Sequence, residues 1–257
     1  MKEFLLVLLW MFIALLAMFA IYVIVMTISA YAVAPIEYTR DSSYYRFLLN
    51  LSLAMLFFVA RINVETEGLE NVPEGTRFLL VSNHRSKFDP MAAWVVFKKY
   101  NLGFISKEKN FHIPWFGRII RKCCCLSIDR ENPRNAIGTV DKAAELLKND
   151  TVSVGVYPEG TRSFSGELLP FHNGMFKIAQ KAGVPIVVTT IEGTENIRKN
   201  YIRRRTDVRL KVVDVISAEE VRESRGTAVL GARVRAAMKN SLEPTEEGAC
   251  DEIPYAI

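Results

Sequence analysis

Charge is missing from the beginning of this sequence: between Phe4 and Ala34 there is no Asp, Glu, Lys or Arg. At about 1.5 Å per residue, a helix of that length exceeds the roughly 30 Å hydrocarbon core of a bilayer. The stretch therefore predicts a membrane helix. A cleavable signal peptide is the alternative, because Ala32-Val33-Ala34 resembles a cleavage site. The apolar part of a signal peptide has only about 7–15 residues, however, which disfavours cleavage.

Cysteine is scarce, and several common site motifs are absent. The four cysteines have neither metal-ligand spacing nor a plausible disulfide pattern. Three of them, Cys123–Cys125, are predicted to enter a buried strand as small apolar residues, and reduced cysteines agree with a cytoplasmic body. There is no Walker-type P-loop and no GxGxxG loop, so nucleotide binding through such loops is unsupported. The lack of a GxSxG elbow argues against an ordinary α/β-hydrolase. No set of His, Cys, Asp and Glu has convincing metal spacing.

Charge of one sign is also missing from the end of the chain. Residues 243–257 hold five carboxylates and no Lys or Arg, so the remainder of a chain with net charge +5 carries +10. The acidic segment predicts a disordered tail. A basic body that follows a membrane helix suggests an anionic bilayer surface or a phosphorylated substrate as partner. Nucleic acid is disfavoured as a partner, since a membrane anchor would keep the chain away from it.

A second apolar stretch, Phe47–Ala60, is too short to span a bilayer comfortably. It predicts an interfacial helix or the second arm of a helical hairpin in one leaflet. Basic residues flank the first helix unequally, with Lys2 before it and Arg40, Arg46 and Arg61 after it. This asymmetry favours a membrane protein whose main body lies on the cytoplasmic side.

The rest of the chain alternates between short apolar runs and helical patterns. Strands are predicted at 62–66, 77–82, 102–106, 123–128, 151–157, 184–191 and 207–216, and helices at 90–100, 132–148, 173–182 and 218–240. Such alternation predicts an α/β fold with a largely parallel central sheet flanked by helices. The predicted domains are membrane-anchoring helices at 1–60, an α/β domain at 61–242 and the acidic tail at 243–257.

The first polar cluster follows the apolar run Phe78–Val81. His84 stands at the carboxyl end of this predicted strand, and Asp89 precedes Pro90 as the predicted N-cap of a helix. In open α/β sheets this crevice binds ligands. A histidine that takes a proton through one ring nitrogen needs an acceptor on the other, and Asp89 is placed to supply it. The alternative is a capping aspartate beside an ordinary loop histidine.

A second cluster, Glu159-Gly160-Thr161-Arg162, follows the predicted strand at 151–157. Arginine suits a bidentate hold on phosphate, and glycine lets backbone N–H groups approach an anion. An ordinary polar turn is the alternative. The strand-end clusters at 83–89, 107–130 and 158–163 share one edge of the predicted sheet, where they could converge.

Four blocks carry a family resemblance. Asn83–Asp89 resembles the NH-four-residues-D signature of the glycerolipid acyltransferases, and Tyr157–Ser163 resembles their FPEGTRS block. Ile113–Gly117, with Ile128-Asp129-Arg130 after it, is similar to the second block, and Val184–Val187 to the VPIV block. All four occur in the family's order across roughly residues 62–195. By pattern, the chain is most similar to the 1-acyl-sn-glycerol-3-phosphate acyltransferases. Tyr157 replaces the usual Phe, and Val188-Thr189 the usual Pro-Val.

The resemblance implies a membrane-bound enzyme of phospholipid biosynthesis. His84, oriented by Asp89, would be the general base for the free hydroxyl of lysophosphatidic acid. That hydroxyl would attack the thioester of acyl-CoA or acyl carrier protein and give phosphatidic acid. The glycerol phosphate would be held by the second cluster, with three further phosphate or donor contacts elsewhere: Glu159, Gly160, Thr161 and Arg162, then Lys107, Arg118 and Arg130. No cofactor and no metal are implied.

Other interpretations remain open at this point. The blocks do not choose the acceptor, so another lysophospholipid or a lyso-amino-acid lipid is an alternative. A non-catalytic lipid-binding protein is a further alternative, although such a protein would need none of the polar residues in the blocks. A hydrolase would release fatty acid without any acceptor. The basic run Arg198–Arg205 is predicted either to lie against anionic lipid or to be a solvated loop.

Overall fold

The computed structural model describes residues 1–129, 133–201 and 203–243. Two compact units divide the chain: an N-terminal unit, of residues 1–55 and 103–139, and a main unit, of residues 56–102 and the described part of 140–257. Because the chain passes between the units more than once, α2, β3 and α6 each begin in one unit and end in the other. The domain boundaries predicted from the sequence stay a prediction.

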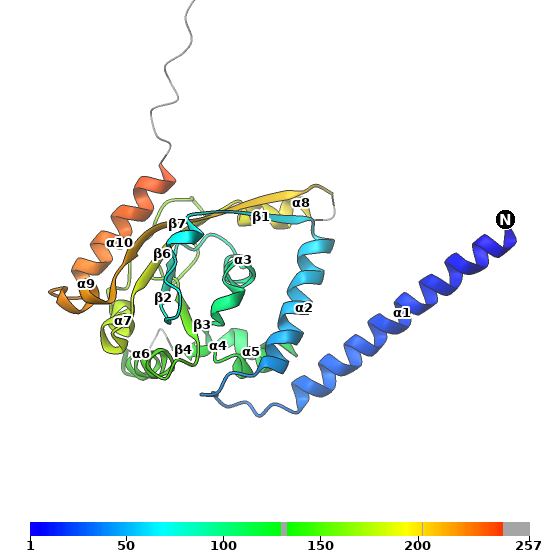
Figure 1. Ribbon diagram of the computed structural model, residues 1–257, viewed down its shortest axis with the longest axis horizontal. Helices are drawn as coiled ribbons and strands as arrows, with labels where there is room; N and C mark the ends of the chain where they lie inside the picture. Colours follow the sequence, from blue (N-terminus) through cyan, green and yellow to red (C-terminus); the bar gives the residue numbers. More distant parts are fainter. Residues whose placement is uncertain (130–132, 202, 244–257) are drawn as a thin grey trace, which may run out of the picture. The chain divides into compact units, whose positions relative to one another are not determined.

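The elements are labelled in Figure 1. Those mainly in the N-terminal unit are α1 Lys2–Tyr31, α2 Ser43–Val59, β3 Leu102–Lys107, α4 Glu108–Phe111, α5 Phe116–Lys122 and β4 Leu126–Ile128. Those mainly in the main unit are β1 Ile62–Glu67, β2 Leu79–Ser82, α3 Asp89–Val96, α6 Pro133–Lys148, β5 Ser153–Val156, α7 Lys177–Ala182, β6 Ile186–Glu192, α8 Ile197–Asn200, β7 Thr206–Ile216, α9 Ala218–Glu223 and α10 Thr227–Leu242. Short 3-10 turns are η1 Leu69–Asn71, η2 Lys98–Tyr100, η3 Asn173–Phe176 and η4 Thr194–Asn196.

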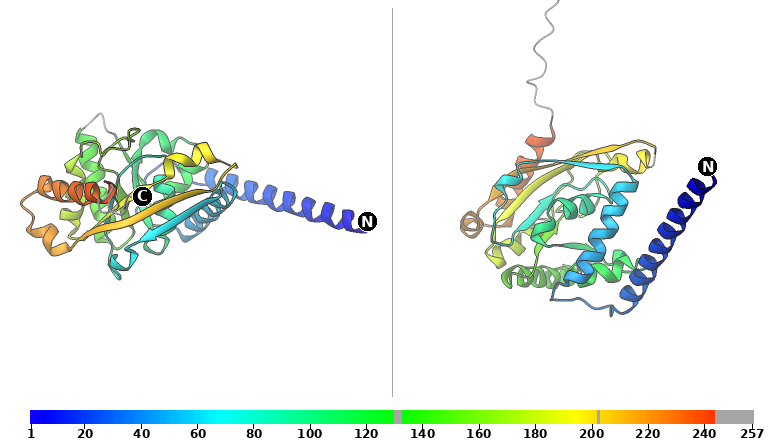
Figure 2. Two further views of the ribbon diagram at one scale, coloured as in Figure 1. Left: turned by 90° about the horizontal axis from the view of Figure 1, so that it is seen from above. Right: turned by 45° about the vertical axis from the view of Figure 1, so that its right-hand side comes forward.

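The sheet of the main unit has the strand order β1-β7-β6-β2-β5. Strand β2 is central and runs parallel to both neighbours, so that Leu79 pairs with Val154 on one side and Ile186 on the other. Strands β1 and β7 are parallel to each other and lie side by side in Figure 2, whereas β6 and β7 are antiparallel. In the N-terminal unit, β3 and β4 pair in parallel. The predicted α/β fold with a largely parallel sheet flanked by helices is confirmed.

Strands β2 and β6 are buried on both faces, which explains why their sequences are mostly apolar and do not alternate between apolar and polar residues. Helix α10 packs on β6 and β7, α3 contacts β1, and Figure 1 shows α10 and α3 on opposite sides of the strands. Just before β2, Phe78 is fully buried, and its ring meets the edges of Phe97 and Tyr100 at centroid distances of 6.0 and 4.9 Å. Each such buried side chain contributes roughly 1.5–3 kcal/mol, so this cluster fixes the strand that carries the first polar block.

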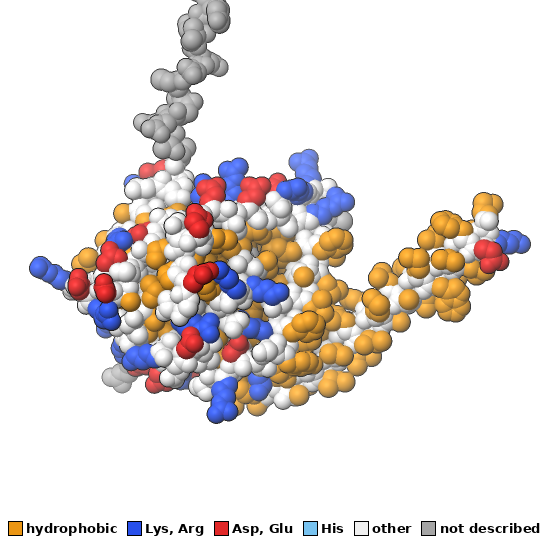
Figure 3. Space-filling model, viewed as in Figure 1, with side chains coloured by type: hydrophobic (Ala, Val, Ile, Leu, Met, Phe, Trp, Pro, Cys, Tyr) orange, Lys and Arg blue, Asp and Glu red, His pale blue; other side chains and the backbone are white. Residues whose placement is uncertain are grey.

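Helix α1 is apolar all round, and Figure 3 shows hydrophobic side chains along its whole length, with charged ones at its N-terminal end. Within the described residues it is the one helix long and apolar enough to cross a membrane. Helix α2 is apolar but shorter. A helix that exposes such a surface is suited to lipid, which supports the predicted membrane association.

Side-chain hydrogen bonds join α1 to the first turn and the middle of α2 inside the N-terminal unit. Tyr22 Oη lies 2.5 Å from Ser52 Oγ, and Ser29 Oγ lies 2.6 Å from Tyr44 Oη. Tyr45 Oη also donates to the carbonyl oxygen of Ser29 at 3.0 Å. Polar groups on an apolar helix need such partners, because lipid offers none. These hydrogen bonds connect α1 to α2, and the placement of the second apolar stretch, at the interface or as a hairpin arm in one leaflet, stays a prediction.

The cysteine run does not lie in a strand, contrary to the sequence prediction. Cys123 caps the end of α5, Cys124 has a φ of +56°, and β4 begins only at Leu126. The amide of Cys125 returns to the carbonyl of Ile120 at 3.1 Å, which closes the end of the helix. All three side chains are buried, and burial raises the pKa of Cys124 to about 12 and of Cys125 to about 11. The expectation of small, buried, unpaired thiols is confirmed, and only their secondary structure differs.

Candidate active site

The loop after β2 leads directly into α3, which begins at Asp89 with Phe88 at the cap position and Pro90 in the first turn. The predicted N-cap is therefore displaced by one residue. The carboxylate of Asp89 does not serve the helix but turns back over the loop. Its Oδ2 accepts hydrogen bonds from the backbone amides of Arg85 and Ser86, both at 2.7 Å. This local turn places the carboxylate of Asp89 within hydrogen-bond distance of His84.

His84 and Asp89 form the predicted pair. His84 Nδ1 lies 2.8 Å from Asp89 Oδ2; Asp89 is fully buried, and the His84 side chain is 17% exposed. Within the described residues, His84 Nε2 makes no hydrogen bond. A carboxylate bound to Nδ1–H leaves Nε2 as the basic nitrogen. The nitrogen without a partner is thus the one that can take a proton from a substrate.

A third residue completes the environment of the carboxylate. The hydroxyl of Thr194, which is fully buried in the turn after β6, donates to Asp89 Oδ1. Asp89 therefore has hydrogen-bond partners on both oxygens. A buried carboxylate needs this, because an unsatisfied charged group inside a protein is costly. Thr194 was not foreseen from the sequence.

Asn83 and Arg85 connect this loop to β6 and its continuation. The side-chain amide of Asn83 pairs with the backbone of Ile191, accepting from its N–H at 2.7 Å and donating to its carbonyl at 3.0 Å. Arg85 Nη1 lies 3.3 Å from Glu192 Oε1, while Nη2 donates to the carbonyl of Gly166 at 3.0 Å. These contacts hold the residues on either side of His84.

The tyrosine that departs from the family block lies against the histidine. The rings of Tyr157 and His84 stack with centroids 4.4 Å apart and an interplanar angle of 29°. Burial, followed by the nearby charge of Asp89, raises the pKa of the Tyr157 hydroxyl well above its usual value, so it stays neutral. The ring thus supports one face of the imidazole and adds no charge.

The second polar block is joined to the first through Glu159. Its Oε1 accepts from the backbone amide of His84 at 2.7 Å, and its Oε2 from that of Leu169 at 3.0 Å. Burial raises the pKa of Glu159, against the opposing effect of the two amides. A further bond, from the amide of Ser163 to the carbonyl of His84 at 2.8 Å, completes the connection. The clusters at 83–89 and 158–163, predicted to share one edge of the sheet, do come together.

The remaining residues of the second block form its outer part. Gly160 has a φ of +68°, and a Cβ there would lie 2.8 Å from the His172 ring, so glycine suits both the backbone and the space. Thr161 is exposed. Arg162 is partly exposed, with its guanidinium 5.3 Å from the centroid of the Phe164 ring. The block therefore presents a hydroxyl and a guanidinium outward while Glu159 stays inside.

The other predicted contacts belong to the N-terminal unit. Lys107 is exposed at the end of β3. Arg118, on α5, donates to the carbonyl of Val33 at 3.2 Å and lies over the ring of Tyr31 at 5.0 Å. Arg130 lies outside the described residues. In the part of the chain that the structure describes, no three His, Cys, Asp or Glu side chains gather as a metal site.

Comparison with known sequences identifies the family. The sequence profile named Acyltransferase matches residues 63–192, about half of the chain. The chain belongs to the acyltransferase family. The matched region of this family member contains both polar blocks and ends just before Thr194.

Individual relatives point in the same direction. The 1-acyl-sn-glycerol-3-phosphate acyltransferase BAT2, chloroplastic, of Brassica napus is 39% identical over 134 residues, which cover 52% of this chain and 38% of the relative. The 1-acyl-sn-glycerol-3-phosphate acyltransferase alpha of Ovis aries is 30% identical over 168 residues, 64% of this chain and 57% of the relative. The chain thus spans between about a third and three fifths of the length of these curated relatives.

A solved structure matches more of the chain. The 1-acyl-sn-glycerophosphate (LPA) acyltransferase PlsC of Thermotoga maritima superposes with a TM-score of 0.62 at 27% sequence identity, covering 82% of this chain and 83% of that one. The fold described above is therefore shared with a solved acyltransferase over most of both chains.

Proposed function

We propose that the chain transfers a fatty acyl group from a thioester to the free sn-2 hydroxyl of lysophosphatidic acid, giving phosphatidic acid. The observation that carries the proposal is the buried Asp89 carboxylate, fixed by Thr194 and two backbone amides and bound to His84 Nδ1 at 2.8 Å. A protein that only binds lipid has no use for a buried charge aimed at a histidine. The names of the relatives, which specify 1-acyl-sn-glycerol-3-phosphate as acceptor, support the substrate.

In the proposed step His84 acts as general base. Its Nε2 takes the proton of the acceptor hydroxyl while the hydroxyl oxygen attacks the thioester carbonyl. The tetrahedral intermediate collapses with cleavage of the carbon–sulfur bond, and the leaving thiolate takes the proton back from the imidazolium. Asp89 fixes the tautomer of His84 and stabilises its cationic form. A positioned base contributes about 10²–10⁴-fold in rate.

Arg162, Thr161 and Gly160 are proposed to hold the glycerol phosphate. A partly exposed guanidinium and an exposed hydroxyl are suitable donors to phosphate oxygens, and the left-handed turn at Gly160 brings backbone close to an anion. Glu159 contributes differently, because its carboxylate would repel a phosphate. It accepts hydrogen bonds from the backbone amides of His84 and Leu169, and we propose that it supports the phosphate site by fixing these two backbone segments.

The donor and the remaining contacts are part of the same proposal. Either acyl-CoA or acyl carrier protein carries the thioester, and no cofactor or metal takes part. Lys107, Arg118 and Arg130 provide further phosphate or donor contacts. Helix α1 keeps the chain in the membrane, where the acceptor lipid is found, with the catalytic residues on the cytoplasmic side.

The test is acyl transfer by the detergent-solubilised full chain, offered labelled oleoyl-CoA with lysophosphatidic acid. His84→Ala is expected to lower turnover by about 10²–10⁴-fold. His112→Ala is the matched control, because that histidine is exposed and pairs only with Glu108. Normal turnover by His84→Ala would contradict the general-base assignment.

Acceptor panels separate the alternatives. Preferential acylation of another lysophospholipid or of a lyso-amino-acid lipid would keep the mechanism and replace the substrate. Release of free fatty acid without an acceptor would identify a hydrolase. If neither donor is consumed with any acceptor, the enzymatic proposal falls in favour of a lipid-binding protein.

A further inference from the structure

The basic loop, formed by helix α8 and the turn that leads from it to β7, carries five cations and no carboxylate between residues 198 and 205: Arg198, Lys199, Arg203, Arg204 and Arg205. Arg205 pairs with Asp207 at 2.7 Å. The other four form no ion pair within the part of the chain that the structure describes, and all four are exposed. Figure 3 shows Lys and Arg side chains gathered at the end of the main unit where Figure 1 draws α8.

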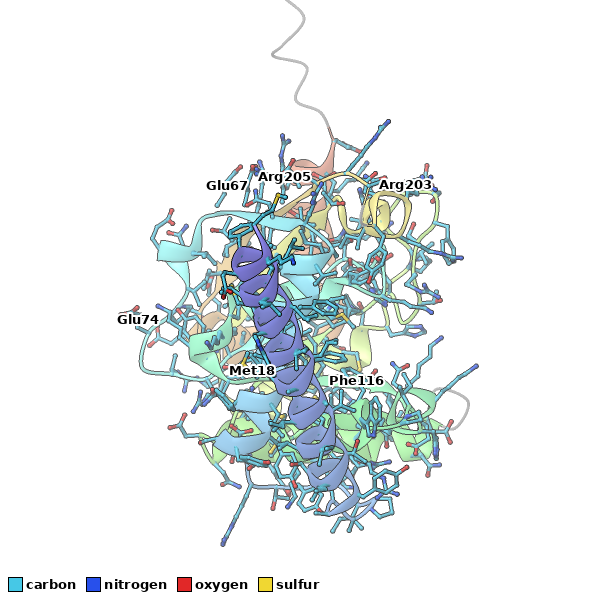
Figure 4. All side chains as sticks on the ribbon, turned by 90° about the vertical axis from the view of Figure 1, so that its right-hand side faces the viewer. Met18, Glu67, Glu74, Phe116, Arg203 and Arg205 are labelled. Carbon is cyan, nitrogen blue, oxygen red and sulfur yellow. The ribbon has the colours of Figure 1, made fainter. Side chains whose placement is uncertain are left out.

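This basic loop is held in place by the backbone below it. Ile197 is fully buried, and the amide of Tyr201 donates to its carbonyl at 2.9 Å. The carbonyl of Asn200 accepts from the amides of both Arg203 and Arg204 at 2.9 Å, and its side chain reaches Thr206 Oγ1 at 3.1 Å. In Figure 4, Arg203 lies beside α8, with Arg205 at the start of β7. Because these bonds fix the backbone of the turn, its exposed cations stay close to one another and can bind one anionic surface together.

Exposed apolar side chains lie directly beside the cations. The carbonyl of Arg61 accepts from the amide of Thr206 at 3.0 Å, so the end of α2 adjoins the end of the basic loop inside the main unit. That end of α2 exposes Phe58 by 85% and Val59 by 52%, and the loop itself exposes Tyr201 by 43%. Arg61 is exposed too and adds a sixth cation.

We propose that this basic and aromatic surface docks on the headgroups of an anionic bilayer; it consists of Phe58, Val59, Arg61, Arg198, Lys199, Tyr201, Arg203, Arg204 and Arg205. Uncompensated cations are attracted to anionic lipid, with roughly a fivefold gain in partitioning for each charge near the surface. Aromatic side chains sit well at the level of the headgroups. An acidic protein, such as an acyl carrier protein, would match the cations but offers no reason for an almost fully exposed phenylalanine beside them.

The test places a nitroxide label on Tyr201→Cys in the full chain. Cys123–Cys125 are buried, and burial raises the pKa of Cys124 to about 12, so these thiols resist the labelling reagent; Cys250→Ser removes the remaining one. The chain is reconstituted in nanodiscs of phosphatidylcholine alone or mixed with phosphatidylglycerol. Collision rates with oxygen and with a water-soluble nickel complex report whether the label lies in the bilayer interface. Val229→Cys, exposed on α10, is the matched control site and should stay in water.

The proposal expects the label at residue 201 to enter the interface only in the anionic discs, and to leave it when salt is raised. Replacing Arg198, Lys199, Arg203 and Arg204 by Gln should abolish the difference between the discs, with an unchanged melting temperature showing that the fold is kept. A label that stays in water in both kinds of disc would overturn the proposal. So would a response seen only after addition of acyl carrier protein, which would assign the surface to an acidic protein.

Discussion

At the scale of single residues, the candidate site depends on one carboxylate with four hydrogen-bond partners. Asp89 receives His84, two backbone amides and Thr194 on its two oxygens. Charge-assisted hydrogen bonds of this kind are stronger than neutral ones and fix the group rigidly. Rigidity matters because the orientation of His84 follows from that of the carboxylate.

Thr194→Val removes the hydroxyl that serves Asp89 Oδ1 and keeps the shape of the side chain. The buried oxygen then lacks a partner, which costs about 1–3 kcal/mol of unfolding free energy. Turnover should fall with it, because Asp89 is no longer held from both sides. Chemical unfolding and kcat of the same preparation measure the two effects.

Thr194→Ser is the control for this prediction, since it keeps the hydroxyl and loses only a methyl group. It should retain most of the turnover. Equal kcat for the valine variant and the unaltered chain would show that the Thr194 hydrogen bond does not serve the reaction.

Glu159 gives the fold a specific pH dependence. Burial raises its pKa above the usual 4.5, so its charged form is less favourable in the folded state than in the unfolded one. The stability that this group contributes is therefore fully present below its unfolded pKa and is lost as the pH rises through the higher folded value. Glu159→Gln removes this titration.

We expect the unfolding free energy of the unaltered chain, minus that of Glu159→Gln, to decrease as the pH rises above about 4.5. Unfolding of both proteins in detergent over a series of pH values measures the difference. A difference that stays constant across the series would mean that Glu159 titrates alike in both states.

The sequence predicts local parts of the site well and distant ones poorly. His84 and Asp89 are separated by one turn, so their contact follows from spacing and chain direction. Thr194 lies 105 residues from Asp89, and nothing in a Gly-Thr pair after a strand distinguishes it from an ordinary turn. The stacking of Tyr157 on His84 was equally hidden, because it depends on β2 and β5 being neighbours.

At the scale of elements, helix α10 supports the loop that follows the second polar block. Arg235 donates to the carbonyls of Leu169 and Leu168 at 2.5 and 2.8 Å. The amide of the same Leu169 serves Glu159, which in turn accepts from the amide of His84. A helix far along the chain thus contributes to the position of the loop that carries His84.

Arg235→Met is expected to loosen residues 164–171 while keeping most of the apolar stem of the side chain. Two backbone carbonyls lose a charged donor, each such bond being worth about 1.5–3 kcal/mol. Limited proteolysis should then cut faster within this loop, and the Michaelis constant for the phosphorylated acceptor should rise.

Arg233→Met on the same helix is the matched control, because Arg233 pairs with Asp214 and Glu220 and makes no contact with the loop. It should lose some stability without faster cleavage at 164–171. Equal cleavage of both variants would mean that the loop does not depend on Arg235.

Element types were easier to predict than their pairing and ends. Short apolar runs predict the strands of the main unit. An apolar run does not show, however, whether two neighbouring strands run parallel or antiparallel, so the antiparallel pairing of β6 with β7 is seen only in the structure. The cysteine run was placed in a strand because it is apolar. Cys124 has a positive φ and lies between the end of α5 and the start of β4. In a run of three identical side chains, nothing in the sequence indicates which residue adopts this left-handed conformation.

At the scale of the whole molecule, α1 and the distribution of cations lead to a prediction of where the protein lies. Lys2 is the first residue of α1, and Arg40, Arg46 and Arg61 follow the helix. Lys and Arg accumulate on the cytoplasmic side of membrane helices. We therefore expect the chain to resist extraction from membranes by alkaline carbonate, with its main unit on the cytoplasmic side.

Trypsin added to sealed vesicles tests the orientation, since Arg225, which is exposed between α9 and α10 of the main unit, is a ready cleavage site. Cleavage there is expected only in vesicles whose cytoplasmic face points outward, and in both kinds after detergent is added. Cleavage confined to vesicles of the opposite orientation would reverse the assignment.

The pairing of β1 with β7 also has a consequence for how the chain is made. Ile62 pairs with Thr206, so the ribosome must add 144 residues after Ile62 before its partner residue exists. At about 5–20 residues per second, β1 waits roughly 7–30 seconds as an unpaired strand next to a membrane. Its sequence, INVETE, bears two glutamates whose charges discourage pairing with a wrong strand during that time. We therefore expect Glu65 and Glu67 to protect the strand during synthesis, before they pair with Arg209 and Lys211 in the finished sheet.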